Sequence, residues 1–344
     1  MTTPLPVSRR IVFRDQAYLA IKMGLVPGMS LVEKFGKNTS LDDADGFRAI
    51  WDGGSAAYTG QAPTASDGEA VEVLSSSAND SGTLISSGTA TSGSATTLVD
   101  TAATFSSDGV AVGDIVINDS QDDHFIVTAV TSETTLTGIR WKFKTTLAVG
   151  DSYRVAQPNS TGAAVVRLNM LQDSVGADGA EYIILNGTTP VDTVGTDYVR
   201  CFRGRVVCGD LVSGVAATNI GTITARQTTT VANIFFVIIA AWGSTEVAAY
   251  RVPAGKTGYI LSWSGGLIGV GSMNVECRLR LRPVGEPWQV ADDLTLRGGG
   301  SSNVEHHFAG GLSVDPFTDI VIEADTNTDS TSLRGGVCLV LVDD

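Results

Sequence analysis

Histidines are the residues of this chain best suited to chemistry, and there are three of them: His124, His306 and His307. A zinc site or a histidine-dependent triad needs several convergent ligands or bases. His306 and His307 are adjacent, so on a strand they would point to opposite faces. His124 follows Asp122 and Asp123 in a predicted turn. We therefore expect surface or interface histidines, no metal site and no catalytic residues.

Two other groups superficially resemble ligand-binding loops. One is a set of carboxylates in the order Asp42, Asp43, Asp45 and Asp52. It lacks the alternation and the closing glutamate of a calcium loop, so a solvated or helix N-terminal cluster is favoured over a casual cation site. The segments Ser264–Gly266 and Gly269–Met273 complete no nucleophile elbow, dinucleotide or Walker pattern, and we interpret them as tight turns. The sequence thus predicts no cofactor and no enzyme.

Charge is unevenly distributed along the 344 residues. The whole chain carries a formal net charge of −14, yet residues 1–37 hold six basic and two acidic residues, a local charge of +4. An acidic protein is poorly suited to free nucleic acid, because affinity for phosphates comes from Lys and Arg. A basic segment on an acidic body predicts docking onto an acidic protein neighbour, with a solvated basic face as the alternative.

Membrane insertion is not expected from this sequence. The longest apolar run, Ile234–Trp242, is far shorter than the roughly 20 residues that span a bilayer, and it predicts a buried strand. The first ten residues lack the apolar region of a signal peptide. Four cysteines without a C-x-x-C spacing, Cys201, Cys208, Cys277 and Cys338, predict buried thiols, with disulfides as the minority alternative.

The elements that must position these residues are predominantly strands. Residues 274–282 alternate strictly, placing Val275, Cys277, Leu279 and Leu281 on one face and Arg278, Arg280 and Arg282 on the other. Less regular runs occur at Ala70–Leu74, Ala164–Leu171, Glu181–Leu185, Asp197–Val207, Asn219–Ala225, Glu246–Val252, Tyr259–Trp263, Ile320–Ala324 and Gly336–Val342. Many short strands with turn signals between them predict an all-β fold, an antiparallel β-sandwich or jelly roll.

The first sixty residues have the character of an extended N-terminal arm. Residues Asp15–Met23 are the best helix candidate, because Tyr18 and Ile21 share a face and Gly24 is placed to end the helix. We expect residues 1–60 to form a docking arm, and a chain beginning near Ala62 to remain folded but to lose attachment.

Several motifs resemble one family of tailed-bacteriophage virion structural proteins. They are Lys34–Asn38 (KFGKN), Ile50–Gly54 (IWDGG), Ser75–Asp80, Leu185–Val191, Tyr250–Tyr259 and Leu279–Pro283. In that family the first two open an arm that leads into an all-β body. The resemblance covers the arm and most of the sandwich, and it implies a structural part of a phage particle, without distinguishing head from tail.

An insertion is indicated by the spacing of two of these motifs. Ser75–Asp80 and Asn159–Ala164 resemble the halves of one hairpin that is almost continuous in the family, yet about eighty residues separate them here. The intervening sequence has its own strand signals, so residues 83–158 are predicted to be a small inserted β domain. These signals are at Thr97–Val99, Ile115–Ile117, Phe125–Val130, Thr135–Thr137 and Tyr153–Val155. The sandwich would then comprise residues 61–82 and 159–344.

The function expected from the resemblance is capsid decoration or cement, with the protein located in the virion. Arg9, Arg10, Arg14, Phe35 and Trp51 would dock on the major capsid protein, although each aromatic could instead pack within its own chain. The arginine face of residues 278–282 is a candidate subunit contact. A homo-oligomer is expected, with a trimer the commonest form for this role. The alternatives are a tail, portal-adaptor or fibre-base component and, more distantly, a glycan-binding module.

Overall fold

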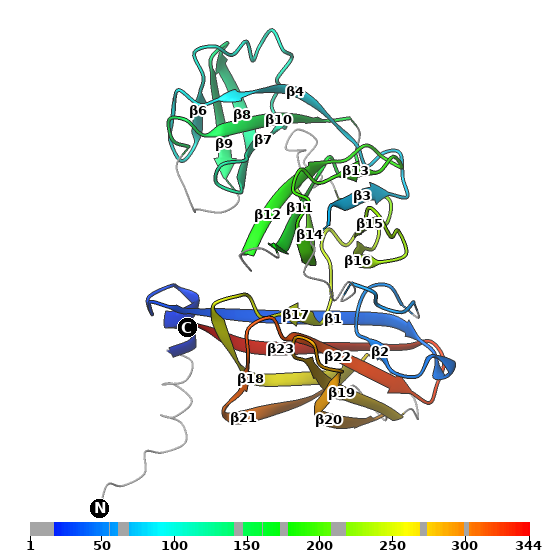
Figure 1. Cartoon of the computed structure of the whole chain (residues 1–344). Helices are drawn as coiled ribbons and strands as arrows, with labels where there is room; N and C mark the ends of the chain where they lie inside the picture. The colour runs from blue at the N-terminus through cyan, green and yellow to red at the C-terminus, as the bar shows by residue number, and fades with distance from the viewer. Residues whose placement is uncertain are drawn as a thin grey trace, which may run out of the picture. The chain divides into compact units, whose positions relative to one another are not determined.

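The structure is a computed structural model that is almost entirely antiparallel β-sheet (Figure 1). It describes residues 17–54, 56–60, 69–140, 147–159, 161–172, 178–207, 218–268, 274–298 and 303–344. The predicted all-β sandwich class is confirmed. In the described part of the chain, no helix is long and apolar enough to cross a membrane.

The chain forms two compact units. The first, called the terminal unit here, contains residues Met1–Ala57 and Val247–Asp344, and the second, the central unit, contains Tyr58–Glu246. The sequence predicted an arm of residues 1–60, a sandwich of residues 61–82 and 159–344, and an inserted domain of residues 83–158, whereas the two units divide the chain near residues 57 and 247. The physical reason lies in strand pairing that joins the two ends of the chain.

The terminal unit is a sandwich of two antiparallel sheets (Figure 1). The first sheet has the order β1 (Met29–Leu41), β23 (Thr331–Asp343), β18 (Lys256–Leu267) and β21 (Asn303–Val314). The second has the order β17 (Ala249–Arg251), β22 (Asp319–Thr326), β19 (Asn274–Arg282) and β20 (Gln289–Arg297), and β2 (Arg48–Ala49) also pairs with β22. A short 3-10 helix, η1 (Asp43–Asp45), lies between β1 and β2.

Successive strands of the terminal unit alternate between the two sheets. From β17 to β23, only the pair β19 and β20 are neighbours within one sheet, and every other step changes sheet. The whole central unit lies in the chain between β2 and β17. Apolar side chains from both sheets fill the space between them, including Trp263, Leu279, Ile322 and Leu339, all essentially inaccessible to solvent.

Two glycines allow these sheets to approach closely. A Cβ atom at Gly265 would lie 2.9 Å from the Sγ atom of Cys277, and one at Gly335 would lie 2.8 Å from Ile50. Ser264–Gly266 was predicted to be a tight turn. That prediction was wrong, because these residues lie inside β18, where the missing side chains make room for the opposite sheet.

The start of the chain is integrated into the sandwich from β1 onward. Residues 17–22 are helical and Gly24 has a φ of +71°, so the predicted helix end is confirmed. Strand β1 then pairs with β23 in continuous register from Met29 opposite Val342 to Asn38 opposite Leu333. A chain beginning near Ala62 would lack β1 and the buried Trp51, so it would lose part of the core rather than only an attachment arm.

The central unit contains the predicted insertion as one seven-stranded sheet, called the inserted domain here (Figure 1). Its order is β4 (Gly82–Thr89), β10 (Ser152–Pro158), β7 (Ile115–Asn118), β8 (Asp123–Ser132), β9 (Thr135–Arg140), β6 (Thr97–Val99) and β5 (Ser92–Gly93). Leu98, Phe105, Val127 and Leu136 belong to a core made only of residues from this segment. The inserted domain therefore has a hydrophobic core of its own.

Two smaller sheets complete the central unit. One has the order β12 (Asp178–Ile184), β11 (Val165–Gln172) and β14 (Tyr198–Val207); the other has the order β13 (Val191–Asp192), β3 (Val71–Ser75), β15 (Ile223–Gln227) and β16 (Ile234–Ile238). Ile115 and Ile117 of the inserted domain share a second buried cluster with Val165, Tyr182 and Val207. The inserted domain is thus packed against the sheet of β11, β12 and β14.

A buried carboxylate ties the entry and exit of the inserted domain to the rest of the central unit. Asp80 is fully buried, and its Oδ1 accepts hydrogen bonds from the backbone N–H groups of Ala163 (2.8 Å) and Ile220 (2.9 Å). Its Oδ2 accepts from the Gly221 N–H (2.8 Å) and the Ser75 hydroxyl (2.5 Å). One side chain thereby joins three segments that are distant in sequence.

Candidate functional site

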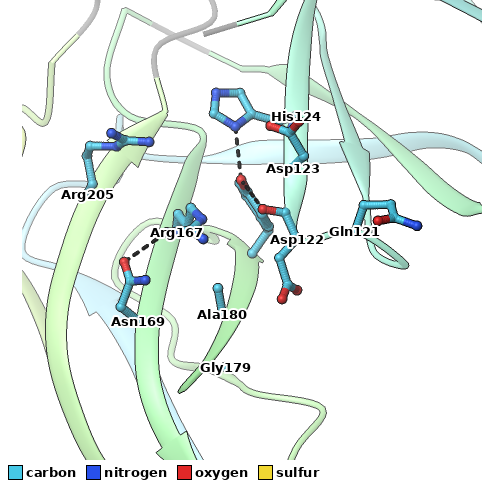
Figure 2. A pocket seen from close by; sticks show the side chains of 10 residues that line it. Gln121, Asp122, Asp123, His124, Arg167, Asn169, Gly179, Ala180 and Arg205 are labelled. Atoms are coloured by element: carbon cyan, nitrogen blue, oxygen red, sulfur yellow. Dashed lines mark hydrogen bonds between the residues drawn. The ribbon is translucent and has the colours of Figure 1, made fainter. Parts of the chain in front are cut away.

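A polar pocket lies in the central unit where the β7–β8 turn of the inserted domain faces the sheet of β11, β12 and β14 (Figure 2). Its volume is about 320 Å³. The residues lining it are Gln121, Asp122, Asp123, His124, Arg167, Asn169, Gly179, Ala180, Tyr182 and Arg205. Among the described residues, this pocket brings together arginine, histidine, tyrosine and aspartate side chains.

Strand register places two arginines together on the pocket wall. On β11 and β14, Arg167 lies directly opposite Arg205, and on β12 Tyr182 lies opposite Arg167. Directly opposed residues of an antiparallel pair project to the same face, so both guanidinium groups emerge on the pocket side. Figure 2 shows them on one side of the pocket, with Gln121, Asp122 and His124 on the other.

His124 and Tyr182 form a neutral hydrogen-bonded pair. The Tyr182 hydroxyl donates to the backbone oxygen of Asp122 (3.2 Å) and lies 3.0 Å from Nδ1 of His124. Because the hydroxyl has one proton, we assign the other hydrogen to Nδ1 of His124, which leaves Nε2 as an acceptor. Burial lowers the pKa of His124 to about 4, assisted by Arg205 and Arg167, and burial raises the pKa of Tyr182 to about 12.

The arginines differ in how they are held. Arg167 donates to the side-chain oxygen of Asn169 (2.9 Å), and its guanidinium carbon lies 5.7 Å from the ring centroid of Tyr182. Arg205 makes no side-chain hydrogen bond or ion pair with any other described residue. Burial, followed by the charge of Arg167, lowers the pKa of Arg205. The guanidinium of Arg205 is therefore a cation with its hydrogen-bond donors still available.

Asp122 supplies the opposite charge. Burial raises the pKa of its carboxyl group, while Arg167 and the backbone N–H of Ala180 act in the other direction. Among the described residues, no group of three or more histidine, cysteine, aspartate or glutamate residues could hold a metal ion. The arrangement can bind a polar ligand through donors on one wall and acceptors on the other.

Sequence reasoning missed this pocket and misplaced His124. The histidine was expected at the surface or at an interface, but it is 5% exposed and contacts a strand of the same chain that is far away in sequence. The alternation of residues 164–171 could have placed Arg167 and Asn169 on one face. No local signal shows that Arg205 lies opposite, because register between separated strands is a tertiary property.

The predicted docking residues are not brought together. Arg9, Arg10 and Arg14 lie outside the described residues. Trp51 is 1% exposed and its indole N–H donates to the backbone oxygen of Ala56 (3.0 Å), so it packs within its own chain. Phe35, in contrast, is 49% exposed on β1. Of the two aromatics, only Phe35 is exposed on the surface of the terminal unit.

Exposed apolar side chains are concentrated near the start of the described chain. Five of them, Leu19, Met23, Leu25, Met29 and Phe35, occur within seventeen residues. A run of this kind is typical of contact surfaces when it forms a patch, and the same part of the chain carries the local positive charge. Residues 19–35 therefore have the composition expected of a docking segment. Trp51 is buried and is not part of this segment.

The arginine face of β19 has partners inside the terminal unit. Arg278 and Arg280 both pair with Glu323, at 2.8 and 3.0 Å, and Arg282 pairs with Asp319 at 2.6 Å. The guanidinium of Arg278 lies 3.5 Å from the ring centroid of Phe47, and Trp288 lies near the other two arginines. Their predicted contact with a neighbouring subunit remains a prediction, and any such neighbour would meet guanidinium groups that are already paired.

The remaining sequence candidates have local roles. His306 and His307 are exposed on β21, and His306 hydrogen-bonds Asp292. In the acidic cluster, Asp45 accepts the backbone N–H of Asp42 (3.1 Å), and Asp42 accepts that of Ser330 (2.8 Å). These carboxylates act as caps for η1 and a neighbouring turn.

Comparisons with known proteins give no assignment. No protein-family model and no curated protein matches the chain. Among solved structures, a particle of infectious bursal disease virus, Gx strain, is similar over 92% of this chain and 72% of its own, at 12% identity and a TM-score of 0.22. The VP2 subviral particle of the same virus is similar over 95% and 78%, at 10% identity and a TM-score of 0.21. Scores this low carry no argument about fold or function.

Proposed function

We propose that this protein is a structural component of a virus particle, built on a jelly roll. The observation that carries the proposal is the strand order of the terminal unit, two sheets ordered β1-β23-β18-β21 and β17-β22-β19-β20. Eight strands that alternate between two sheets in this way have the connectivity of two Greek keys, an architecture found in viral capsid and lectin domains.

Fold alone does not select between these roles, because one architecture carries many functions. The motifs that resemble phage virion proteins favour the virion role, and several of them map onto the terminal unit: Lys34–Asn38 in β1, Ile50–Gly54 after β2 and Leu279–Pro283 at the end of β19. In the pocket of the central unit, His124 contacts the Tyr182 hydroxyl, but the hydrogen assigned to Nδ1 and the pKa of Tyr182, raised to about 12 by burial, argue against a base-activated nucleophile. We therefore propose assembly rather than catalysis as the activity.

Within a virus particle, we propose that the specific role is capsid decoration or cement. The exposed apolar residues of segment 19–35 and the basic residues Arg9, Arg10 and Arg14 would dock on the major capsid protein, and the central unit would display the inserted domain. Apolar anchors surrounded by positive charge suit an acidic partner, with charge guiding encounter and burial supplying affinity. Assembly as a homo-oligomer, such as a trimer, is part of the proposal.

Copy number in purified particles tests this role directly. Quantitative mass spectrometry would compare this chain with the major capsid protein. A ratio near one to one supports decoration of the whole shell, whereas a ratio below about one to thirty means a tail or vertex component, since symmetry allows few such positions. Absence from purified particles would overturn the virion role.

A further inference from the structure

The polar pocket of the central unit has a charge arrangement that folding does not require. Like charges placed directly opposite each other on neighbouring strands are destabilising, yet Arg167 and Arg205 occupy such positions. Arg205 has no ion pair or hydrogen bond with another described residue that would offset this cost. A negatively charged ligand in the pocket would offset the repulsion between the two arginines.

The hydrogen-bonding groups of the pocket fall into two complementary sets. Arg205 offers its guanidinium N–H groups, and Asn169, whose oxygen already accepts from Arg167, can offer its amide N–H groups. On the other side, the Asp122 carboxylate and Nε2 of His124 are acceptors. The pocket can therefore bind an anionic group at one end and hydroxyl groups at the other (Figure 2).

We propose that this pocket binds a carboxylated sugar unit, such as a uronic acid residue of an acidic polysaccharide. A guanidinium presents parallel N–H donors that match the two oxygens of a carboxylate. Sugar hydroxyls would donate to Asp122 and His124. A simple inorganic anion would use only the donors and would be repelled by Asp122. A volume of about 320 Å³ is at the small end of ligand pockets and suits one such unit.

Binding of D-glucuronate to the full-length protein tests the proposal, with D-glucose and inorganic phosphate as comparison ligands. Isothermal titration calorimetry would give affinities, and NMR of histidine side chains would locate the site. His124 lines the pocket, whereas His306 and His307 lie in the terminal unit. We expect glucuronate to bind at least tenfold more tightly than either comparison ligand and to shift the His124 signals alone.

Two variants and a control separate this site from general charge effects. Arg205→Gln removes the unpaired guanidinium and should weaken glucuronate binding at least tenfold, since the charge-assisted hydrogen bonds to the carboxylate are lost. Arg297→Gln, an exposed arginine of the terminal unit, should leave binding unchanged. Asp122→Asn should weaken glucuronate but strengthen phosphate. Asn tolerates the φ of 50° at this position, so this variant remains informative if Arg205→Gln fails to fold.

Three results would overturn the proposal. One is a glucuronate titration in which the His124 signals do not move. Another is equal affinity for phosphate and glucuronate, which would indicate a general anion site without sugar recognition. The third is unchanged glucuronate affinity in a folded Arg205→Gln protein. The inference concerns the central unit alone and does not depend on the proposed role in a virus particle.

Discussion

Asp80 provides the sharpest test of how the inserted domain is held. Its carboxylate is fully buried and accepts three backbone N–H groups and one hydroxyl, from Ser75, Ala163, Ile220 and Gly221. Replacing Asp80 by alanine leaves three backbone N–H groups without this acceptor, of which those of Ala163 and Gly221 are buried and that of Ile220 is partly buried. Each unsatisfied group costs about 1–3 kcal/mol, partly offset because a buried charge is also removed. We expect Asp80→Ala to lower the free energy of unfolding of the central unit by about 3–5 kcal/mol.

Asp80→Asn should lower the free energy of unfolding by less than Asp80→Ala does. An amide retains one oxygen, which can still accept from Ala163 and Ile220. Its NH₂ group can donate to the Ser75 oxygen but faces the N–H of Gly221, so one donor is left unpaired. The expected loss is about 1–3 kcal/mol, intermediate between the native residue and alanine.

Urea unfolding of the full-length protein measures these losses, with hydrogen–deuterium exchange to localise them. Exchange should accelerate most in peptides that contain residues 75–81, 161–168 and 218–225, because Asp80 joins these segments. Asp192→Ala, an exposed aspartate on β13 of the same unit, is the matched control and should behave as the native protein. If Asp80→Ala unfolds at the same urea concentration as this control, the carboxylate does not hold the three segments together.

Three further perturbations test other parts of the structure. The pKa of His124 is about 4 in the folded protein, against an ordinary value of 6.5, so on acidification the unfolded chain binds the proton first. The free energy of unfolding should therefore fall by about 3 kcal/mol as the pH drops from 6.5 to 4. The charged groups that face His124 are Arg167, Arg205, Asp122 and Asp123. Urea titrations over that range should show a flatter profile in His124→Asn, and equal slopes would contradict the assignment. Trp51→Ala removes a buried side chain and should destabilise the terminal unit by about 3–5 kcal/mol. Phe35→Ala removes an exposed side chain, so it should cost under about 1 kcal/mol in stability but weaken particle binding in a cosedimentation assay. Equal thermal stability of the two variants would refute their assigned positions. Glu323→Gln should cost about 2 kcal/mol, because it weakens the ion pairs of both Arg278 and Arg280, and a loss that does not shrink in high salt would argue against this electrostatic origin.

Local patterns determined much of the secondary structure. The alternation of residues 274–282 predicted β19 with both ends correct and with its arginines on the face opposite the buried residues. The strand signals at 97–99, 115–117 and 135–137 all begin at the observed starts of β6, β7 and β9. Gly24 ends the first helical segment because glycine readily adopts a positive φ. These features depend on neighbours within a few residues, which is why sequence alone reveals them.

Pairing between distant segments was decided only by the tertiary structure. Residues 29–41 have no strong strand alternation, yet they pair with the last strand of the chain, and this brings Trp51 into the core instead of onto a docking surface. The opposition of Arg167 and Arg205, and the contacts of Asp80 with residues 163, 220 and 221, also depend on register between separated strands. A period of two shows which face of a strand is buried. It does not show which strand lies beside it, because that choice is made by the packing of the whole core.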